Sequence, residues 1–517
     1  ETYCYPFREI GGVKRANRDA AVNLEIEDGV ARVGFHTTAA WPQAFARVQA
    51  GNQLLLTRRI AISPDEPFIT EVELPEGTEP HEVRVALVVG SNELIAYSPA
   101  RFEPEPMPPA VQAPPPPEEI ATVEELFLTG QRIRQFHNPA LEPDPYWEEA
   151  LRRDSGNAQV NLAMGIDRYK KGLYEEAERH LRSALERLTA GYTAPRDGEP
   201  WFYLGLTPRA QQRFDEAYEA FYMATWSEAW KAPAHLQLAQ LDSLFGNTAQ
   251  ALAHLERSLV GNAMNTRALT MKAALLTSLG RADEALGVAS AARFVDPLDP
   301  RAMREVWMAG GTEEVAAEYL FTLQQFPENG LELAMEYFDE GRFQSAADVL
   351  DEVIRVSADD SQVAPLAYYF LGYLQQILGQ GSESRDSLAR ASMLPPDRVF
   401  PWQKDLVPVL RYAMLVNPGD ARAPYYLGNL LFDDQPTTAI AHWELARELD
   451  PDFPIVHRNL ALAYARSYRF DEAIASMERA VAGSPQYAIH FYELDEMYEA
   501  AGRSPEERLA LLEANHD

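Results

Sequence analysis

The sequence of 517 residues carries 78 acidic and 46 basic side chains, which gives a formal net charge of −32. A field of this sign repels phosphate backbones, so we exclude nucleic-acid binding through a general basic surface. Hydrophobic residues make up 46% of the chain and aromatic residues 10%, which is typical of a folded protein rather than a disordered one. No apolar run approaches the roughly 18 residues that a membrane-spanning helix needs, so we expect no membrane insertion.

Cys4 is the only cysteine, which excludes an intramolecular disulfide bond. A single thiol fits a reducing compartment, and we therefore expect a cytoplasmic location while leaving an exported one open. The chain begins with Glu1 rather than Met and shows no signal peptide. We therefore expect it to be a processed or truncated piece with sequence missing upstream.

Residues 1–101 are predicted to form a small antiparallel β-sandwich domain with an N-terminal connector. Between residues 22 and 98 apolar side chains alternate with polar ones, which is the period of a β-strand. The segment AVNLEIEDGVARVGF predicts a hairpin, because Asp28-Gly29 tolerates the positive φ that a tight turn requires. Further alternating runs bring the expected number to seven short strands, which favours a sandwich.

Residues 102–119 contain eight prolines in 18 residues. Proline at this density is incompatible with the hydrogen-bond ladders of helices and sheets, and it favours an extended polyproline II spacer. A ligand for a proline-binding module is the alternative function for this segment. We favour the proline-rich linker.

Residues 120–517 follow the period of helices, and a longer repeat is superimposed on it. An alanine in an acidic or polar context returns at separations of 40, 34 and 34 residues, and a later pair is again 34 apart. A small residue lies about 12 positions before five of these alanines. The alanines are Ala177, Ala217, Ala251, Ala285, Ala439 and Ala473, and the small residues are Gly165, Gly205, Ala239, Ala273 and Ala461.

This pattern resembles the tetratricopeptide repeat (TPR), in which small side chains let two helices cross closely. The resemblance implies about nine or ten stacked repeats, since one repeat cannot bury its own apolar face. The fold class we expect is therefore mainly α, with a TPR-type α-solenoid preceded by the small β-sandwich. Arg301–Asn329 and Ala391–Asp420 do not keep the spacing, so we expect degenerate repeats that bend the superhelix, and the segment RSPEERLALLEANHD is expected to be a polar closing helix.

The stretch WFYLGLTPRAQQRFDEAYEAFYMATW, residues 201–226, is crowded with aromatic and acidic side chains. In the repeat register most of its aromatic residues are packing positions. Its carboxylates fall at the start of a helix, where acids complement the helix dipole and are usually solvated. We therefore reject an active site here. Pro208 falls inside the first helix of this repeat, where it removes an N–H group, so we expect a kink or a break.

The sequence shows no signature of a catalytic, metal or phosphate site. HExxH, CxxC, GxxxxGK[ST] and GxSxG are all absent. His235 and His254 lie on the two helices of one repeat, but a lone pair lacks the ligands of a defined metal site, so we expect surface or core histidines. We therefore predict no catalytic residue, metal ligand or cofactor in this chain, and we expect any activity to lie in a missing upstream domain.

A binding surface is better supported. In the TPR superhelix that the pattern resembles, the concave face is lined mainly by positions 2, 5, 9, 12 and 13 of the first helices. A groove lined by aromatic rings, with a few amides and arginines, suits an extended peptide or a glycan. The same rings also suit the filling of a tight superhelix or packing on the β-domain. The candidate groove residues are Tyr169, Phe202, Leu206, Arg209, Tyr369, Tyr373, Gln376, Tyr425, Asn429, Phe432 and Arg458.

Beyond the repeat, the whole chain resembles the C-terminal part of large bacterial TPR proteins. The segments that carry this likeness are IGGVKRANRDAAVNLEI near the start, PDPYWEEALRRDSGNAQVNLAMG at residues 143–165, and the aromatic stretch at 201–226. In those proteins a galactose-mutarotase-like domain of uncharacterised function precedes a small β-domain and the repeats. The resemblance therefore implies a sugar-handling domain upstream of Glu1, and it carries over no catalytic residue.

These observations predict a scaffold that presents a concave TPR groove to a partner protein or peptide, with self-association as an open possibility. The alternative function is that of an accessory, non-catalytic region of a larger carbohydrate-active bacterial protein, which positions or binds glycan. Neither function involves nucleic acid, a membrane or a cofactor.

Overall fold

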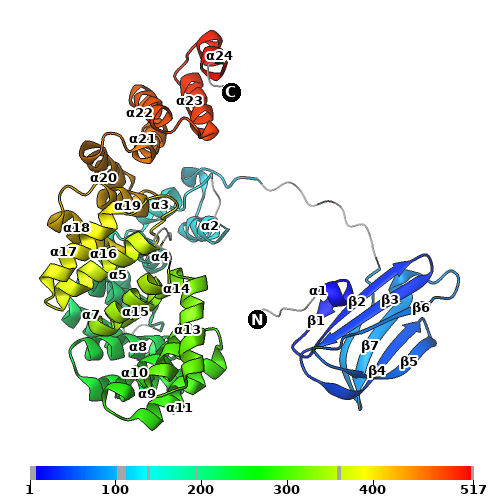
Figure 1. Cartoon of the computed structure of the whole chain (residues 1–517). Coiled ribbons are helices and arrows are strands. Elements are labelled where there is room, and N and C mark those ends of the chain that lie inside the picture. The colour runs from blue at the N-terminus through cyan, green and yellow to red at the C-terminus, as the bar shows by residue number, and fades with distance from the viewer. Residues whose placement is uncertain are drawn as a thin grey trace. The chain divides into compact units, whose positions relative to one another are not determined.

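The computed structural model describes residues 7–101, 107, 112–136, 140–191, 196–357 and 363–513. The chain divides into two compact units, Glu1–Ala113 and Pro114–Asp517 (Figure 1). Half of the predicted proline-rich linker, at residues 102–106 and 108–111, lies outside the described residues. We call the two units the β unit and the helical unit.

The β unit is a sandwich of two antiparallel sheets of four strands each. In chain order its elements are α1 (Phe7–Ile10), β1 (Arg15–Ala16), β2 (Ala20–Glu27), β3 (Val30–Thr37), β4 (Trp41–Ala50), β5 (Gln53–Ile62), β6 (Phe68–Glu73), the 3-10 turn η1 (Pro80–Glu82), β7 (Val83–Val89) and β8 (Asn92–Tyr97). One sheet has the strand order β1-β2-β3-β6 and the other has the order β5-β4-β7-β8. The predicted antiparallel β-sandwich is confirmed, and β1 adds a short strand in the expected N-terminal connector.

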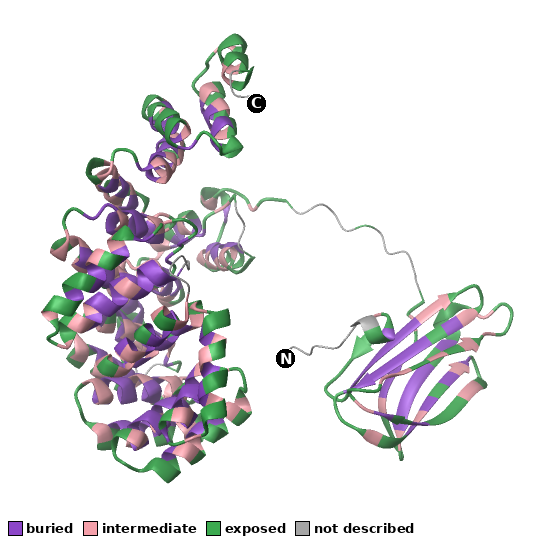
Figure 2. Cartoon of the chain, viewed as in Figure 1, coloured by how far each residue is buried: buried purple, intermediate pink, exposed green. Residues whose placement is uncertain are grey.

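The hairpin between β2 and β3 forms where the sequence places it. Asp28 and Gly29 have φ values of 50° and 78°, which a tight two-residue hairpin turn requires. Leu24 and Val33 are buried between the two sheets. The other face of β2 is buried as well at Ala21, which packs against Ile10 of α1, and Figure 2 shows long buried stretches along the strands of this unit. The period of two in the sequence is therefore not matched by one face in solvent at this end of β2.

The helical unit begins with a 3-10 turn and continues as helices joined by short turns. Its elements are η2 (Pro117–Glu119), α2 (Val123–Phe136), α3 (Asp144–Arg153), α4 (Ala158–Lys170), α5 (Tyr174–Thr189), α6 (Glu199–Ala210), α7 (Phe214–Ala224), α8 (Glu228–Leu244), α9 (Thr248–Gly261), α10 (Thr266–Ser278), α11 (Ala282–Val295), α12 (Pro300–Met308), α13 (Glu313–Gln325), α14 (Glu328–Asp339), α15 (Phe343–Val356), α16 (Ala364–Ile377), α17 (Gly381–Met393), α18 (Leu406–Val416), α19 (Arg422–Leu431), α20 (Pro436–Leu449), α21 (Pro454–Arg466), α22 (Phe470–Gly483), α23 (Ala488–Ala500) and α24 (Pro505–Glu513). None of these helices is long and apolar enough to cross a membrane, within the described part of the chain.

Close helix crossings explain the small residues of the repeat. A Cβ atom on Gly205 in α6 would lie 2.6 Å from the ring of Phe221 in α7. A Cβ on Gly372 in α16 would likewise lie 2.8 Å from the side chain of Leu388 in α17. Each first helix can therefore approach its second helix only where a small residue faces a large one, which is the packing that the pattern predicts.

The helix α6 runs without a break through Pro208 to Ala210, so the predicted break is wrong. Pro208 lies in the last turn of the helix, where the missing N–H group removes only one hydrogen bond near the end. The hydroxyl of Thr207 donates a hydrogen bond of 2.9 Å to the carbonyl oxygen of Tyr203, which binds the side chain into the same turn.

The two segments without the repeat spacing are irregular in the structure as well. Within Arg301–Asn329 the helix α12 has only 9 residues, although it still pairs with α13. Within Ala391–Asp420 the single helix α18 lies between two hairpins, α16/α17 and α19/α20, and follows a long connection. The closing helix α24 has no buried residue in its described range, as expected of a solenoid end.

The end of the predicted linker is part of the helical unit. The hydroxyl of Tyr146 in α3 donates a hydrogen bond of 3.2 Å to the carbonyl oxygen of Pro115. The guanidinium of Arg153 donates to the carbonyl oxygens of Ile120, at 2.6 Å, and Pro117, at 3.3 Å. Residues 115–119 are thus held on α3.

Candidate functional site

A later helix, α14, and the turn after it contact the helices α6, α8 and α10 of the N-terminal repeats. The hydroxyl of Ser243, near the end of α8, donates a hydrogen bond of 2.7 Å to the carbonyl oxygen of Glu340, which directly follows α14. A Cβ atom on Gly341 would lie 2.6 Å from the Cα atom of Leu244, and Gly341 has a φ of 72°. Only glycine therefore lets this turn approach the end of α8 so closely.

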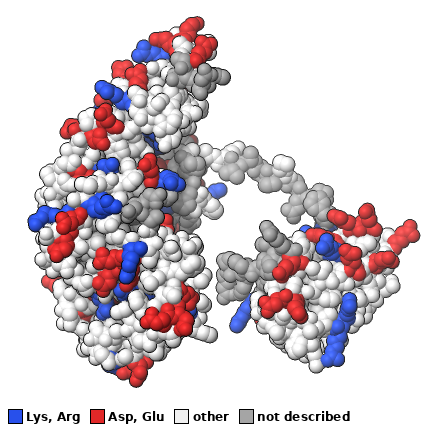
Figure 3. All heavy atoms as spheres, viewed as in Figure 1, with Lys and Arg blue, Asp and Glu red and all other residues white. Residues whose placement is uncertain are grey.

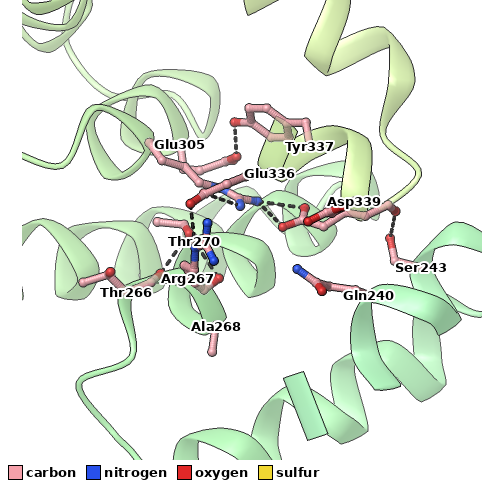
Figure 4. Close-up of polar contacts among 12 residues, drawn as sticks. Gln240, Ser243, Thr266, Arg267, Ala268, Thr270, Glu305, Glu336, Tyr337 and Asp339 are labelled. Atoms are coloured by element: carbon pink, nitrogen blue, oxygen red, sulfur yellow. Dashed lines mark hydrogen bonds and ion pairs between the residues drawn. The ribbon is translucent and has the colours of Figure 1, made fainter. Parts of the chain in front are cut away.

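Two arginines, one in α10 and one in α12, pair with a glutamate of α14 and with the glutamate that follows this helix; Figure 4 labels Arg267 and Glu336 of this group. Arg267 in α10 lies 2.7 Å from a carboxylate oxygen of Glu336 in α14. Arg301 in α12 lies 2.9 Å from the other oxygen of Glu336 and 2.6 Å from Glu340. Arg301 and Glu340 are almost completely buried, so their ion pair lies inside the unit, whereas Arg267 is largely exposed at its edge.

The environments of the two glutamates shift their pKa values in opposite directions. Burial raises the pKa of Glu336, but the nearby Arg301 and Arg267 outweigh burial and leave the pKa below its usual value. For Glu340 burial outweighs the attraction of Arg301 and raises the pKa to about 7. Because both carboxyl groups are held by arginines of the same chain, the arrangement joins helices and presents no free acid for catalysis.

Tyr337 extends this polar cluster into the core beneath α14. Its ring centroid lies 4.7 Å from the guanidinium carbon of Arg301 and 5.2 Å from that of Arg304. Its hydroxyl donates a hydrogen bond of 2.5 Å to Glu305. Arg304 also pairs with Glu352 at 3.2 Å. Each of these buried charges has a partner, which is the condition under which such groups are tolerated inside a protein.

Arg209, one of the candidate groove residues, takes part in the same contact. Its guanidinium donates to the side-chain oxygens of Gln237 and Gln240, the latter at 2.6 Å. It also donates to the carbonyl oxygen of Asp339 at 3.1 Å. Arg209 thus links α6, α8 and α14, and its donors are directed to groups of its own chain.

Tyr169, Phe202 and Leu206 are half-buried in the N-terminal repeats. The ring centroid of Tyr169 lies 6.0 Å from that of Tyr203, and the ring centroid of Phe202 lies 4.8 Å from that of Trp230. Leu206 packs at the edge of the same apolar cluster as Phe202. These contacts are packing contacts between neighbouring repeats.

Tyr369 and Tyr425 are core residues in the C-terminal repeats. Tyr369 is completely buried, and its hydroxyl donates a hydrogen bond of 2.6 Å to Asp420. Tyr425 is 2% exposed, with its ring centroid 5.0 Å from that of Phe453. Replacing either tyrosine would therefore test folding rather than ligand binding.

The remaining candidates have mixed environments. Tyr373 and Phe432 are half-buried, and the ring of Phe432 lies 4.8 Å from that of Trp443. The indole N–H of Trp443 donates to the side-chain oxygen of Asn429 at 3.1 Å. Gln376 is exposed near the end of α16. None of these four candidates lines an open groove in the C-terminal repeats.

That open groove, of about 510 Å³, lies along the N-terminal ends of α19, α21 and α23. Its apolar lining includes Phe453, Ile455, Tyr487 and Ile489, and its charged lining includes Arg422, Arg458, Asp450 and Asp452. About half of the surface of Tyr487 and of Ile489 is exposed, so the apolar lining faces solvent. A groove with exposed apolar side chains between charged groups is the usual composition of a binding surface.

The repeat register explains this lining. Arg422, Ile455 and Ile489 occupy the second position of three consecutive repeats, and Arg458 occupies the fifth. Arg458 is the candidate residue from the sequence that lies in the groove, where it pairs with Glu493 at 2.5 Å. The sequence analysis did not list Arg422, Ile455 and Ile489 as candidates. The second position of the repeat, which also belongs to the concave face, would have identified them.

His235 and His254 form a buried pair. Their Nδ1 atoms lie 2.9 Å apart, and the Nε2 atom of His254 lies 3.6 Å from a carboxylate oxygen of Asp242. Burial and, to a lesser extent, repulsion from Arg257 lower the pKa of His235 to about 4. Burial and, to a lesser extent, repulsion from His235 lower the pKa of His254 to about 4. In the described part of the chain no three His, Cys, Asp or Glu side chains are grouped to hold a metal ion.

Comparisons with known families agree with both units. Residues 15–97 match the family model described as the second domain of a YphG-like protein. Residues 162–233, 331–397 and 431–488 match the model of the tetratricopeptide repeat. The helical unit is therefore a solenoid of tetratricopeptide repeats, as the sequence pattern predicts.

Several solved structures match parts of this chain at low identity and with low TM-scores. A structure described as Naa15/Naa10 bound to HypK-THB is 16% identical, with 75% of this chain and 68% of that chain covered and a TM-score of 0.27. YrrB, described as a TPR protein with an unusual peptide-binding site, is 15% identical, with 46% and 96% covered and a TM-score of 0.18. A tetratricopeptide repeat protein from Parabacteroides merdae is 15% identical, with 59% and 98% covered and a TM-score of 0.28.

Proposed function

We propose that this chain is a scaffold that holds a partner protein or peptide in the open groove along α19, α21 and α23. The observation that carries the proposal is the contrast between two parts of one solenoid. Helices of the N-terminal repeats are contacted by α14 and the turn after it, whereas the C-terminal repeats leave an open groove of about 510 Å³. Repeat solenoids characteristically use such concave surfaces for binding.

The chemistry of the groove favours an extended peptide segment. Ile455 and Ile489 come from consecutive repeats and offer separate apolar contacts for side chains along a peptide. Arg422 and Asp450 lie on the same lining and supply charges of both signs to orient it. On the face shown in Figure 3, acidic and basic side chains of the helical unit are interspersed, so specificity is expected from the groove and not from a large single-sign patch.

No observation on the described residues favours the glycan-positioning alternative. The sugar-handling domain expected upstream stays a prediction that rests on the resemblance of the sequence alone. Self-association likewise stays a prediction. A binding selection on the full chain separates these alternatives from peptide binding.

The test is a selection of peptides from a random phage-displayed library on the immobilised full-length chain. The affinity of the selected peptides is then measured with the wild type and with Ile489→Asp. A buried charge in the apolar groove should weaken binding about tenfold or more. Ile377→Asp is the matched control, because Ile377 is 40% exposed on α16, Ile489 is 49% exposed, and only Ile489 lines the groove.

Selected peptides that bind Ile489→Asp as well as the wild type would contradict the groove assignment. Failure of the library to yield binders, together with specific binding on a glycan array, would favour the glycan function. Melting temperatures of both variants close to that of the wild type establish that the comparison concerns binding and not folding.

A further inference from the structure

A second cavity, of about 360 Å³, lies between α20, α21 and α22. Its lining residues are Arg447, Pro451, His457, Ala475, Ser476 and Arg479. It shares no lining residue with the open groove, although both adjoin the turn between α20 and α21. The cavity is therefore a separate feature, and a ligand in it would not depend on the proposed scaffold function.

Two arginines from different helices, Arg447 in α20 and Arg479 in α22, line this cavity and form no ion pair with a carboxylate in the described ranges. Arg447 lies within hydrogen-bond reach of the hydroxyl of Tyr464. The pKa of Glu472 is lowered by its hydrogen bond from Arg469 and also by the charge of Arg447. The positive charge of the cavity is therefore compensated only from beyond ion-pair distance.

His457 adds a buried polar group with an unsatisfied atom. Its Nε2 atom lies 2.7 Å from the carbonyl oxygen of Pro451, and because a carbonyl can only accept, Nε2 carries the proton and donates. The other ring nitrogen, Nδ1, has no partner among the described residues, although the side chain is only 7% exposed. Ser476 is 6% exposed on the same lining and carries a hydroxyl. The unpartnered Nδ1 is itself shielded from solvent, so the ring of His457 forms part of the cavity wall and offers a ligand no hydrogen bond there.

We propose that this cavity binds a phosphate group. Guanidinium groups donate paired hydrogen bonds to phosphate oxygens, and the arginines here come from two helices, α20 and α22, which suits the several oxygens of a phosphate. The hydroxyl of Ser476 in α22 can donate a further bond. The volume of about 360 Å³ leaves room beside the phosphate for the group that carries it.

The net charge of −32 opposes the binding of anions to the surface as a whole. A negative field disfavours anions over most of the surface, so an anion that binds must be held by local donors. Binding should therefore be limited to a single site and weaken as salt screens the arginines. The shared chemistry of the ligand is a phosphate, either free or on a phosphorylated side chain.

The test is isothermal titration calorimetry of the full chain with inorganic phosphate at constant ionic strength, with O-phosphoserine and acetate as parallel titrants. Arg479→Ala should weaken phosphate binding about tenfold or more, because a charge-assisted hydrogen bond is lost. The matched control is Arg257→Ala. Arg257 is also exposed, and it lies six residues after the repeat alanine Ala251, as Arg479 lies six residues after Ala473.

Each outcome decides the assignment. Phosphate binding that Arg479→Ala weakens and Arg257→Ala leaves unchanged supports it, and tighter binding of O-phosphoserine than of phosphate would identify a phosphorylated side chain as the source. The assignment is overturned if phosphate does not bind at about 10 mM, if acetate binds equally well, or if both arginine variants bind like the wild type. Arg447→Gln provides a second variant on the opposite wall of the cavity.

Discussion

His235 and His254 illustrate how burial decides what a titratable side chain does. In the sequence the two histidines are ordinary members of two helices, and their spacing alone carries no signal of contact. In the structure they are 5% and 1% exposed, and their Nδ1 atoms lie 2.9 Å apart. One neutral ring must donate to the other in such a pair, so protonation of both rings would replace the hydrogen bond with repulsion between buried charges.

The histidine pair should therefore make stability depend on pH. The pKa of each histidine is lowered to about 4 in the folded chain, against an ordinary value of 6.5. As the pH falls below 6.5 the unfolded chain takes up protons first, so the stability that the neutral pair contributes is present above that pH and is lost toward pH 4. Denaturant titrations between pH 6.5 and pH 4 should show that the free energy of unfolding falls less for the double variant His235→Gln, His254→Gln than for the wild type. An equal fall in both proteins would contradict this prediction, and so would NMR signals of the two imidazoles that titrate with an ordinary pKa.

The helical hairpins are the elements that the sequence predicts well. Their small residues, such as Gly205, recur because the partner helix leaves no room for a Cβ atom, so local spacing reports tertiary packing. The position of α14 could not be predicted in this way. It depends on contacts between residues far apart in the chain, and the hydrogen bond from Ser243 to Glu340 spans 97 residues. The spacing of a repeat describes contacts between neighbouring helices. It carries no information on which distant helices of the solenoid come into contact.

The candidate groove was predicted only in part for the same reason. The concave register includes Arg458, which lines the open groove, and it applies equally to Tyr425, which does not. Tyr425 is nevertheless covered by Phe453 from the following turn, a contact that the register does not include. Whether a concave position is open or filled is thus decided by turns and by irregular helices such as α18, which do not follow the repeat.

At the level of elements, Gly341 should be the critical residue for the contact between α8 and the turn after α14. In the sequence it is one of several turn glycines, such as Gly379, and the two have φ values of 72° and 77°. They differ in surroundings, because a Cβ on Gly341 would lie 2.6 Å from the Cα of Leu244, whereas nothing lies within 4 Å at Gly379. Gly379→Ala should cost about 1–2 kcal/mol from the left-handed conformation alone. Gly341→Ala should cost about 1–3 kcal/mol more, because the backbone of Leu244 must move.

Free energies of unfolding from denaturant titration measure the difference between these two variants. Native-state hydrogen exchange gives a second measure, since exchange at the end of α8 should accelerate in Gly341→Ala and stay unchanged in Gly379→Ala. Equal losses of stability in the two variants would show that the turn does not hold α8 through this contact.

At the level of the whole molecule, each unit has its own buried core. Leu24 lies in the core between the two sheets, and Leu350 lies in the large core of the helical unit. We therefore predict two separate unfolding transitions in calorimetry of the full chain, each governed by one core. Leu24→Ala should cost the β unit about 2–5 kcal/mol and lower one transition, and Leu350→Ala should do the same to the other.

The two substitutions serve as controls for each other, because both remove a buried leucine of at most 3% exposure. If either variant lowered both transitions, the units would unfold as one cooperative body, and the stability of the groove would then depend on the β unit. If each variant lowers only one transition, the groove and the phosphate cavity belong to a solenoid whose stability is set by its own repeats. Measurements on those two sites can then be interpreted from the helical unit alone.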